Sequence, residues 1–170
     1  DGVRFRLGAP LPAVRRDDAE AILVAAGRAP NVEGLNLDAA GVRHGPHGVT
    51  VNDRLQTTNS RVFAAGDVAL PYKFTHAADA TARIVVQNAM FFGRKRMSSL
   101  VMPWCTYTIP EVARVGEIGG DAVTVPLGDV DRAVVDDETS GFVRVYHDGA
   151  RIRGCTIVAP HAGDLIGHIA

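Results

Sequence analysis

Cysteine and lysine are scarce in this sequence, and long apolar runs are missing. The 170 residues include two cysteines, Cys105 and Cys155, which lie too far apart for a CxxC or CxxxxC spacing. This excludes a metal knuckle and a local redox disulfide. A chain with so few cysteines is typical of a reducing compartment, so we predict a cytoplasmic location.

No apolar stretch approaches the roughly 18 residues that a bilayer-spanning helix needs, and the start lacks the pattern of a signal peptide. The formal net charge is −1, with 22% charged and 46% hydrophobic residues. This balance gives no electrostatic attraction to nucleic acid or to an anionic membrane. We therefore expect a globular protein without either partner. Its first residues, DGVRFRLG, are typical of the interior of a domain, so we expect the chain to begin within a fold.

Two apolar runs without polar alternation predict buried parallel strands, at residues 21–27 (AILVAAG) and 62–65 (VFAA). The first run ends at Gly27, and the second is followed by Gly66 and Asp67. Ligands of open α/β sheets bind at the carboxyl ends of parallel strands, and glycine lets a ligand approach the backbone. Asp67 is therefore a candidate ligand acceptor, with an Asx turn or a helix cap as the alternative.

A helical pattern follows at residues 75–93, where apolar side chains recur at spacings of three and four and Gly93 gives a stop signal. Thr75 is a suitable N-cap for this helix. A Gly-Asp turn, a short loop and a helix N-terminus would together present free amides and the positive end of a helix dipole to an electron-rich ligand. We interpret the basic cluster at 94–96 as a charge complement of the helix C-terminus.

The second half of the sequence predicts an α+β unit with an antiparallel sheet. Short β-type segments occupy residues 122–127, 142–146 and 151–159. The Asp148-Gly149 pair between the last two segments is a strong hairpin signal. An amphipathic helix is expected to begin in the final segment, HAGDLIGHIA. A weaker β signal lies at residues 49–51 in the first half.

Several stretches, taken in order, resemble the flavoprotein disulfide reductases, and most closely their mercuric reductase and dihydrolipoamide dehydrogenase branch. These stretches are LVAAGRAPN (23–31), LQTTNSRVFAAGDVA (55–69), YKFTHAADATARIVVQNAMF (72–91), PWCTYTIPEVARVG (103–116), DVDRAVVDDETSGFVRV (129–145) and GCTIVAPHAGDLI (154–166). The resemblance implies the tail of an NAD(P)-binding domain at 1–31 and the C-terminal segment of a parallel-sheet FAD-binding domain at 32–97. It implies an incomplete α+β dimerisation domain at 98–170.

The resemblance gives Asp67 a role. Thr57 followed by Gly66 and Asp67 matches the family's second FAD fingerprint, in which the aspartate accepts a hydrogen bond from the ribityl chain of the flavin. A carboxylate is a strong acceptor for a sugar hydroxyl, which agrees with this role. The cofactors implied are FAD and either NADPH or NADH. The partners implied are a small-molecule substrate and a second copy, bound through residues 98–170.

The same resemblance places the helix that begins at Thr75 with its N-terminus toward the pyrimidine edge of the flavin. Backbone amides near His76 and Ala77 would stabilise negative charge on the reduced ring. The imidazole of His76 is either structural or catalytic, and we assign it no catalytic role. Gly27 and Arg28 match the last strand of the NAD(P)-binding domain, where Arg28 either forms an ion pair or contacts a phosphate.

Other reactive side chains do not point to a site. Cys105 matches a packing position of the dimerisation domain, so we expect a buried and inert thiol. His44 and His47 lie three apart in a Gly-Pro loop without an acidic or cysteine neighbour, so we expect no metal site there. The prediction is a chain with cofactor-binding residues but without catalytic residues or metal ligands of its own.

Four motifs of the family are missing from these residues: two GxGxxG loops, a CxxxxC pair and a C-terminal His-Glu pair. The connections RRDDAE (15–20) and EIGGD (117–121) are also short, since the family carries further strands and a helix there. We therefore expect uncovered apolar surface and a marginal or oligomer-dependent fold.

The leading hypothesis is part of an FAD-dependent, NAD(P)H-linked oxidoreductase of the mercuric reductase-like type. Electrons would pass from nicotinamide through flavin to a disulfide or a metal-thiol substrate, and the isolated chain would be inactive. The alternatives are a dihydrolipoamide dehydrogenase-type enzyme or a non-catalytic flavin-binding and dimerising fragment.

Overall fold

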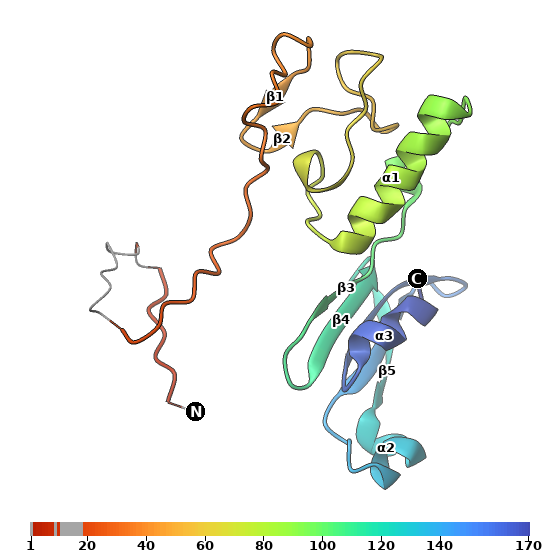
Figure 1. Cartoon of the computed structure of the whole chain (residues 1–170). Helices are drawn as coiled ribbons and strands as arrows, with labels where there is room; N and C mark the ends of the chain where they lie inside the picture. The colour runs from red at the N-terminus through yellow and green to blue at the C-terminus, as the bar shows by residue number, and fades with distance from the viewer. Residues whose placement is uncertain (1, 9, 11–18) are drawn as a thin grey trace.

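A computed structural model describes residues 2–8, 10 and 19–170. An N-terminal stretch runs away from the rest of the chain, and it leads into an upper part that contains the long helix α1 (Figure 1). The strands β3 to β7 form a sheet below that helix. Within the described ranges, no helix is both long and apolar enough to cross a bilayer.

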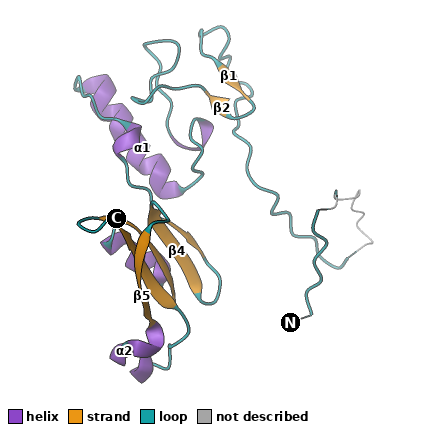
Figure 2. Cartoon of the chain, turned by 180° about the vertical axis from the view of Figure 1, so that it is seen from behind, coloured by secondary structure: helices purple, strands orange, loops and turns teal. Residues whose placement is uncertain are grey.

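The prediction of a buried strand at residues 21–27 is wrong. This segment has no regular secondary structure, and the side chains of Leu23 and Val24 are 92% and 81% exposed. Figure 2 shows it as a loop that is separate from the sheet. A parallel strand forms only where neighbouring strands accept its hydrogen bonds and cover its apolar faces. Among the residues that the structure describes, none pairs with this segment.

The strand predicted at residues 62–65 is also not formed as a strand. Phe63 makes a single antiparallel bridge with Gln56, and the segment is half-buried rather than buried on both faces. The weaker β signal near residue 49 corresponds to a short hairpin of β1 (His44–Gly45) and β2 (Gly48–Val49). Every strand pair in the described part of the chain is antiparallel, so the parallel pairing expected for residues 32–97 does not occur there.

The predicted long helix is confirmed as α1 (Thr75–Met90). Thr75 is its first residue rather than its N-cap: Phe74 holds the cap position, and no side chain caps the helix. The buried side of α1 carries Ala77, Thr81 and Ile84. The helix ends before the basic cluster and has no basic residue in its last turn, so our interpretation of residues 94–96 as its charge complement is wrong.

The predicted antiparallel sheet of the second half is confirmed, and it has five strands in the order β3-β4-β7-β6-β5. Its strands are β3 (Trp104–Thr106), β4 (Glu111–Gly116), β5 (Asp121–Pro126), β6 (Phe142–His147) and β7 (Ile152–Ala159). The Asp148-Gly149 turn joins β6 to β7, as its sequence predicted. The short helices are α2 (Asp131–Val135) and α3 (Ala162–Leu165), and 3₁₀ turns lie at Gly66–Val68, Met97–Ser99, Leu127–Asp129 and Ile166–His168.

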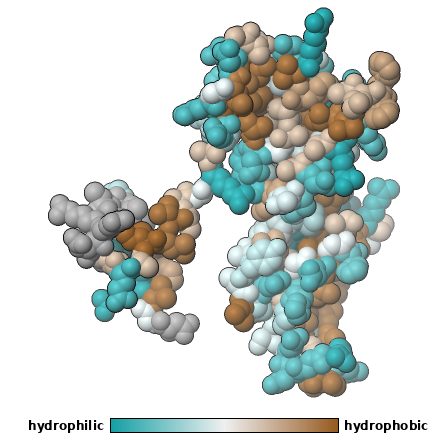
Figure 3. Space-filling model, in the orientation of Figure 1, coloured by the Kyte–Doolittle hydropathy of each residue, from teal (hydrophilic) through white to brown (hydrophobic). Residues whose placement is uncertain are grey.

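One face of this sheet forms a hydrophobic core. Side chains of β4 and β7 pack there against α3 and the turn that follows it, through Ala113, Val115, Cys155, Ile157, Ala159, Ala162 and Ile166. Strand β5 lies at the edge of the sheet, and all six of its residues are exposed. Apolar side chains are visible at the surface of both the upper and the lower part (Figure 3). We expected uncovered apolar surface next to the short connection at 117–121. Strand β5 follows that connection, and its apolar side chains are exposed.

Candidate functional site

The candidate site is the Gly66–Val68 turn where it meets the start of α1. The Gly66 N–H donates to Thr81 Oγ1 at 3.3 Å, and that hydroxyl donates to the carbonyl of Ala77 at 2.7 Å. Thr81 is fully buried. One threonine hydroxyl therefore fixes the turn against the second turn of α1, and Asp67 is held beside the helix N-terminus.

Glycine is required in this turn for two reasons. Gly66 has a φ of +74°, in the left-handed region that non-glycine residues rarely adopt. A Cβ atom at this position would also lie 3.1 Å from the Cβ of Ala78 on α1. The close approach of turn and helix thus depends on the absence of a side chain.

Strand β2 supports the turn from its other side. Gly48 has a φ of +102°, and a Cβ atom there would overlap the carbonyl oxygen of Val68. Its register partner Gly45 has open space around the corresponding position. The β1–β2 hairpin therefore packs directly onto the backbone of the turn, through a glycine whose replacement would force the two backbones apart.

Two cations surround Asp67. The Arg28 guanidinium Nη1 lies 3.4 Å from Asp67 Oδ2 and donates to the carbonyl of Lys73 at 2.8 Å. The Lys73 ammonium donates to the backbone carbonyl of Asp67. The Asp67 side chain remains 47% exposed, so one carboxylate keeps access to solvent. Of the two alternatives for Arg28, the structure shows an ion pair.

Beside these two cations is a hollow of about 680 Å³. Arg28, Pro30, His47, Gly48 and Lys73 belong to its lining. Gly27, also expected near a cofactor, has a φ of +95° and open space where a Cβ would stand. It precedes Arg28 in the exposed N-terminal stretch.

The N-terminus of α1 is open. Its first internal bond runs from the Ala78 N–H to the Phe74 carbonyl at 3.0 Å. The amides of Thr75, His76 and Ala77 have no partner among the described residues, and the first turn has no acidic side chain. Such amides carry the positive end of the helix dipole. Thr75 and His76 are exposed there, whereas Ala77 is buried.

The His76 imidazole has a structural contact. Its Nε2–H donates to the carbonyl of Pro103 at 2.7 Å, and its ring stacks on Phe74 with centroids 5.3 Å apart. The side chain therefore joins the start of α1 to the segment that enters β3. This agrees with the structural alternative of the two that the sequence left open.

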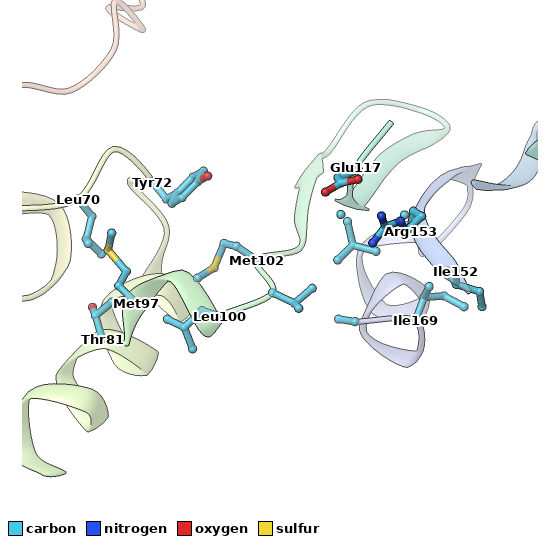
Figure 4. A pocket seen from close by; sticks show the side chains of 15 residues that line it. Leu70, Tyr72, Thr81, Met97, Leu100, Met102, Glu117, Ile152, Arg153 and Ile169 are labelled. Carbon is cyan, nitrogen blue, oxygen red and sulfur yellow. The ribbon is translucent and has the colours of Figure 1, made fainter. Parts of the chain in front are cut away.

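A separate cavity of about 470 Å³ lies between α1 and the sheet (Figure 4). Its walls are mostly apolar, with Leu70, Tyr72 and Met102 on one side and Ile152 and Ile169 on the other. Neither Asp67 nor the open amides of α1 belong to its lining. The cavity adjoins the candidate site through Thr81 but does not reach the groups proposed to bind a ligand.

Cys105 is half-buried, less than we predicted. Its thiol lies 3.7 Å from Glu111 Oε2, which accepts the Gly163 N–H at 2.9 Å. Burial raises the pKa of the Cys105 thiol, and the Glu111 carboxylate raises it further. Cys155 is fully buried, and burial raises its pKa as well. A raised pKa lowers the fraction of reactive thiolate at neutral pH.

We expect Glu111→Gln to increase the reaction rate of Cys105 with an aromatic disulfide reagent at neutral pH by a few-fold. Removing the neighbouring charge lowers the thiol pKa, and each pKa unit changes the thiolate fraction about tenfold. The glutamine oxygen can still accept the Gly163 N–H. The measurement is the rate of thiol modification as a function of pH. Glu138→Gln, at an exposed carboxylate, is the control; an unchanged profile in Glu111→Gln would contradict the assignment.

Sequence reasoning missed three contributors to the site and one ion pair outside it. Thr81, Lys73 and Gly48 were not singled out, although a threonine on the buried side of a helix is a recognisable signal for a hydroxyl that bonds backbone. An acidic neighbour of His44 was also missed: His44 Nε2 lies 3.4 Å from Asp38 Oδ1. Among the described residues, no group of three or more His, Cys, Asp or Glu side chains could hold a metal ion.

Comparison with known proteins identifies the family of this chain. Residues 10–84 match the family described as pyridine nucleotide-disulphide oxidoreductase, and residues 102–170 match its dimerisation domain. A mercuric reductase from Staphylococcus aureus is 39% identical over 161 residues, which are 88% of this chain and 29% of that protein. A dihydrolipoyl dehydrogenase from Bacillus subtilis is 31% identical over 165 residues, which are 89% of this chain and 35% of that protein.

A solved structure has the same fold. The HOCl-induced flavoprotein disulfide reductase RclA from Escherichia coli superimposes with a TM-score of 0.78 at 26% identity, over 88% of this chain and 38% of that one. The chain thus spans about three tenths of the length of the mercuric reductase it matches. Two matches to one family, in order and over most of the sequence, agree with the motifs and with the antiparallel sheet. The chain therefore belongs to the pyridine nucleotide-disulphide oxidoreductase family.

Proposed function

We propose that this chain is the flavin-contacting and subunit-joining part of an FAD-dependent, NAD(P)H-linked oxidoreductase. The observation that carries the proposal is the fixed arrangement of the Gly66–Val68 turn and the open N-terminus of α1. The turn offers a carboxylate acceptor, and the start of α1 beside it offers free backbone donors. This donor and acceptor set suits a ligand with both sugar hydroxyls and an electron-rich ring.

The residues present fit FAD in the following way. Asp67 would accept a ribityl hydroxyl, and the amides of Thr75, His76 and Ala77 would face the edge of the flavin. When bound, FAD supplies the electron-transfer chemistry, whereas the protein supplies position and field. Gly27 and Arg28 would lie toward NADPH or NADH.

Two residues support Asp67 in this role. Arg28 and Lys73 hold its carboxyl group and its backbone carbonyl, respectively, so that the acceptor is oriented before a ligand arrives. An ionised carboxylate is the stronger acceptor for a hydroxyl group.

The substrate of the whole enzyme is proposed as a disulfide or a thiol-bound metal ion. The mercuric reductase from S. aureus is more similar to this chain than the dihydrolipoyl dehydrogenase from B. subtilis is. RclA, which shares the fold, has also been solved as a Cu(II) complex. Cys105 and Cys155 are both free and poorly reactive, so the exchanging thiols would come from outside these residues. The isolated chain is then a flavin-binding and dimerising fragment without turnover.

The experiment that tests the proposal compares FAD with riboflavin in a fluorescence titration of the chain. The proposed contacts reach the ribityl chain and the ring but not the pyrophosphate, since no GxGxxG loop is present. We therefore expect the two dissociation constants to agree within about threefold, or about 0.6 kcal/mol. Absence of binding, or FAD binding more than tenfold tighter than riboflavin, would contradict the assigned contacts.

A homodimer through residues 98–170 is the second part of the proposal. It is supported by the match of residues 102–170 to the dimerisation domain of the family. The exposed apolar residues of this part, including those of β5, are consistent with a surface that a partner covers.

A further inference from the structure

Strand β5 is an open edge of the sheet. It pairs with β6 on one side, and within the described part of the chain no strand pairs with its other side. The opposite edge is much shorter, because β3 has three residues against six in β5. An exposed edge strand presents free N–H and C=O groups that can pair with another strand. Proteins commonly protect such edges with lysine, proline or an inward charge. In β5 these devices are confined to the two ends, Asp121 and Pro126, and none occurs between Ala122 and Val125.

The sequence of β5 is self-complementary. The three residues Val123, Thr124 and Val125 read the same in both directions. If two copies of β5 pair antiparallel about a two-fold axis through Thr124, Val123 of each copy lies opposite Val125 of the other. An isologous interface of this kind is closed by symmetry and leaves no further edge to extend.

The two valines also align across the sheet with residues that face the hydrophobic core. Val125 is in register with Val143, which is paired with Ile157, and Val123 is in register with Val145. Those partners belong to or pack against the hydrophobic core, so both valines are on the core face. Yet Val123 is 58% exposed and Val125 is 43% exposed. A second β5 would continue both apolar rows and cover these side chains.

The opposite face of β5 is already occupied. Arg144 Nε donates to Thr124 Oγ1 at 2.8 Å, so the residue on the proposed axis is held in place by its own neighbour. Its side chain therefore points away from the core face, where the two valines would meet. The edge is ordered before any pairing takes place.

We propose that β5 pairs antiparallel with β5 of a second copy of the chain, which joins the two five-stranded sheets into one. The proposal names the contact surface of the homodimer proposed above and rests on it. Pairing of two six-residue strands buries a small area, and interfaces well below the standard size are weak and transient. We therefore expect association that depends on protein concentration.

The test is sedimentation velocity over a series of protein concentrations, with two variants that remove the same valines. In Val123→Lys/Val125→Lys, four positive charges would meet across the axis. In Val123→Lys/Val125→Glu, each lysine would face a glutamate of the other copy. Opposite charges directly across a strand pair stabilise it, and like charges destabilise it. We expect the Lys/Lys variant to dimerise at least tenfold more weakly than the unmodified chain, and the Lys/Glu variant to recover most of that loss.

Equal far-UV circular dichroism of the variants shows that loss of association is not loss of folding. If the chain is dimeric and the Lys/Lys variant dimerises equally well, pairing through β5 is wrong while the homodimer stands. If the Lys/Lys and Lys/Glu variants both dimerise equally weakly, residue 123 does not lie opposite residue 125 of the other copy. This result would overturn the register about Thr124. A chain that stays monomeric at every concentration would overturn the homodimer and the pairing together.

Discussion

Replacement of Gly48 by alanine is expected to lower the free energy of unfolding by about 3 kcal/mol, the largest effect of any single change considered for this chain. The left-handed conformation costs a non-glycine residue about 1–2 kcal/mol, and overpacking costs about 1–3 kcal/mol. Both penalties apply, because the new Cβ would overlap the Val68 carbonyl. Denaturant unfolding followed by far-UV circular dichroism measures the change.

Gly45→Ala is the matched control. Gly45 is the register partner of Gly48, but it has no positive φ and nothing within 4 Å of the new Cβ. Its expected effect lies within about 0.5 kcal/mol, as for other substitutions away from special features. Equal effects of the two changes would contradict the close packing of β2 on the turn. Because that packing positions Asp67, Gly48→Ala should also weaken flavin binding, whereas Gly45→Ala should not.

Asp67→Ala is expected to weaken binding of riboflavin and of FAD by roughly tenfold to a hundredfold. Hydrogen bonds to charged groups contribute about 1.5–3 kcal/mol, and the substitution removes the proposed acceptor. The effect on folding should be small, because the Arg28 pair is largely exposed to solvent and such pairs contribute little. Fluorescence titration gives the affinities, and denaturant unfolding checks the stability.

The control for this change is Asp79→Asn. Asp79 is an exposed carboxylate on α1 that pairs with Arg83, four residues later. Its removal changes the net charge as Asp67→Ala does, but it leaves the turn intact. Unchanged affinity in Asp67→Ala, or an equal loss in Asp79→Asn, would show that Asp67 is not the acceptor.

Local signals predicted much of the fold. The spacing of apolar residues located α1, and the Asp148-Gly149 turn located the hairpin of β6 and β7, because both signals act between residues close in the sequence. The segments at 21–27 and 62–65 carry equally strong apolar patterns but form no strands. A strand buried on both faces depends on neighbours elsewhere in space, and side-chain pattern contains no information about whether they are present.

Only the local part of the candidate site could be predicted from the sequence, because its other contacts join residues far apart in the chain. Gly66 and Asp67 were found from their motif, but the ion pair of Asp67 joins residues 39 positions apart in the sequence. The Thr81 hydroxyl that fixes Gly66 is 15 positions away. Neither contact leaves a pattern in either segment alone. Family resemblance located the acceptor, whereas only the fold shows what holds it.

The hydrogen bond between His76 and Pro103 has a consequence for communication between the two ends of the molecule. It joins the first turn of α1 to the residue that precedes β3, so the helix end of the candidate site is tied directly to the start of the sheet. If ordering of that helix end favours the sheet arrangement that pairs with a second copy, then pairing must favour the ligand by an equal factor, since coupling free energies are reciprocal. The proposed flavin and the proposed second subunit would then act as allosteric effectors of each other through one imidazole.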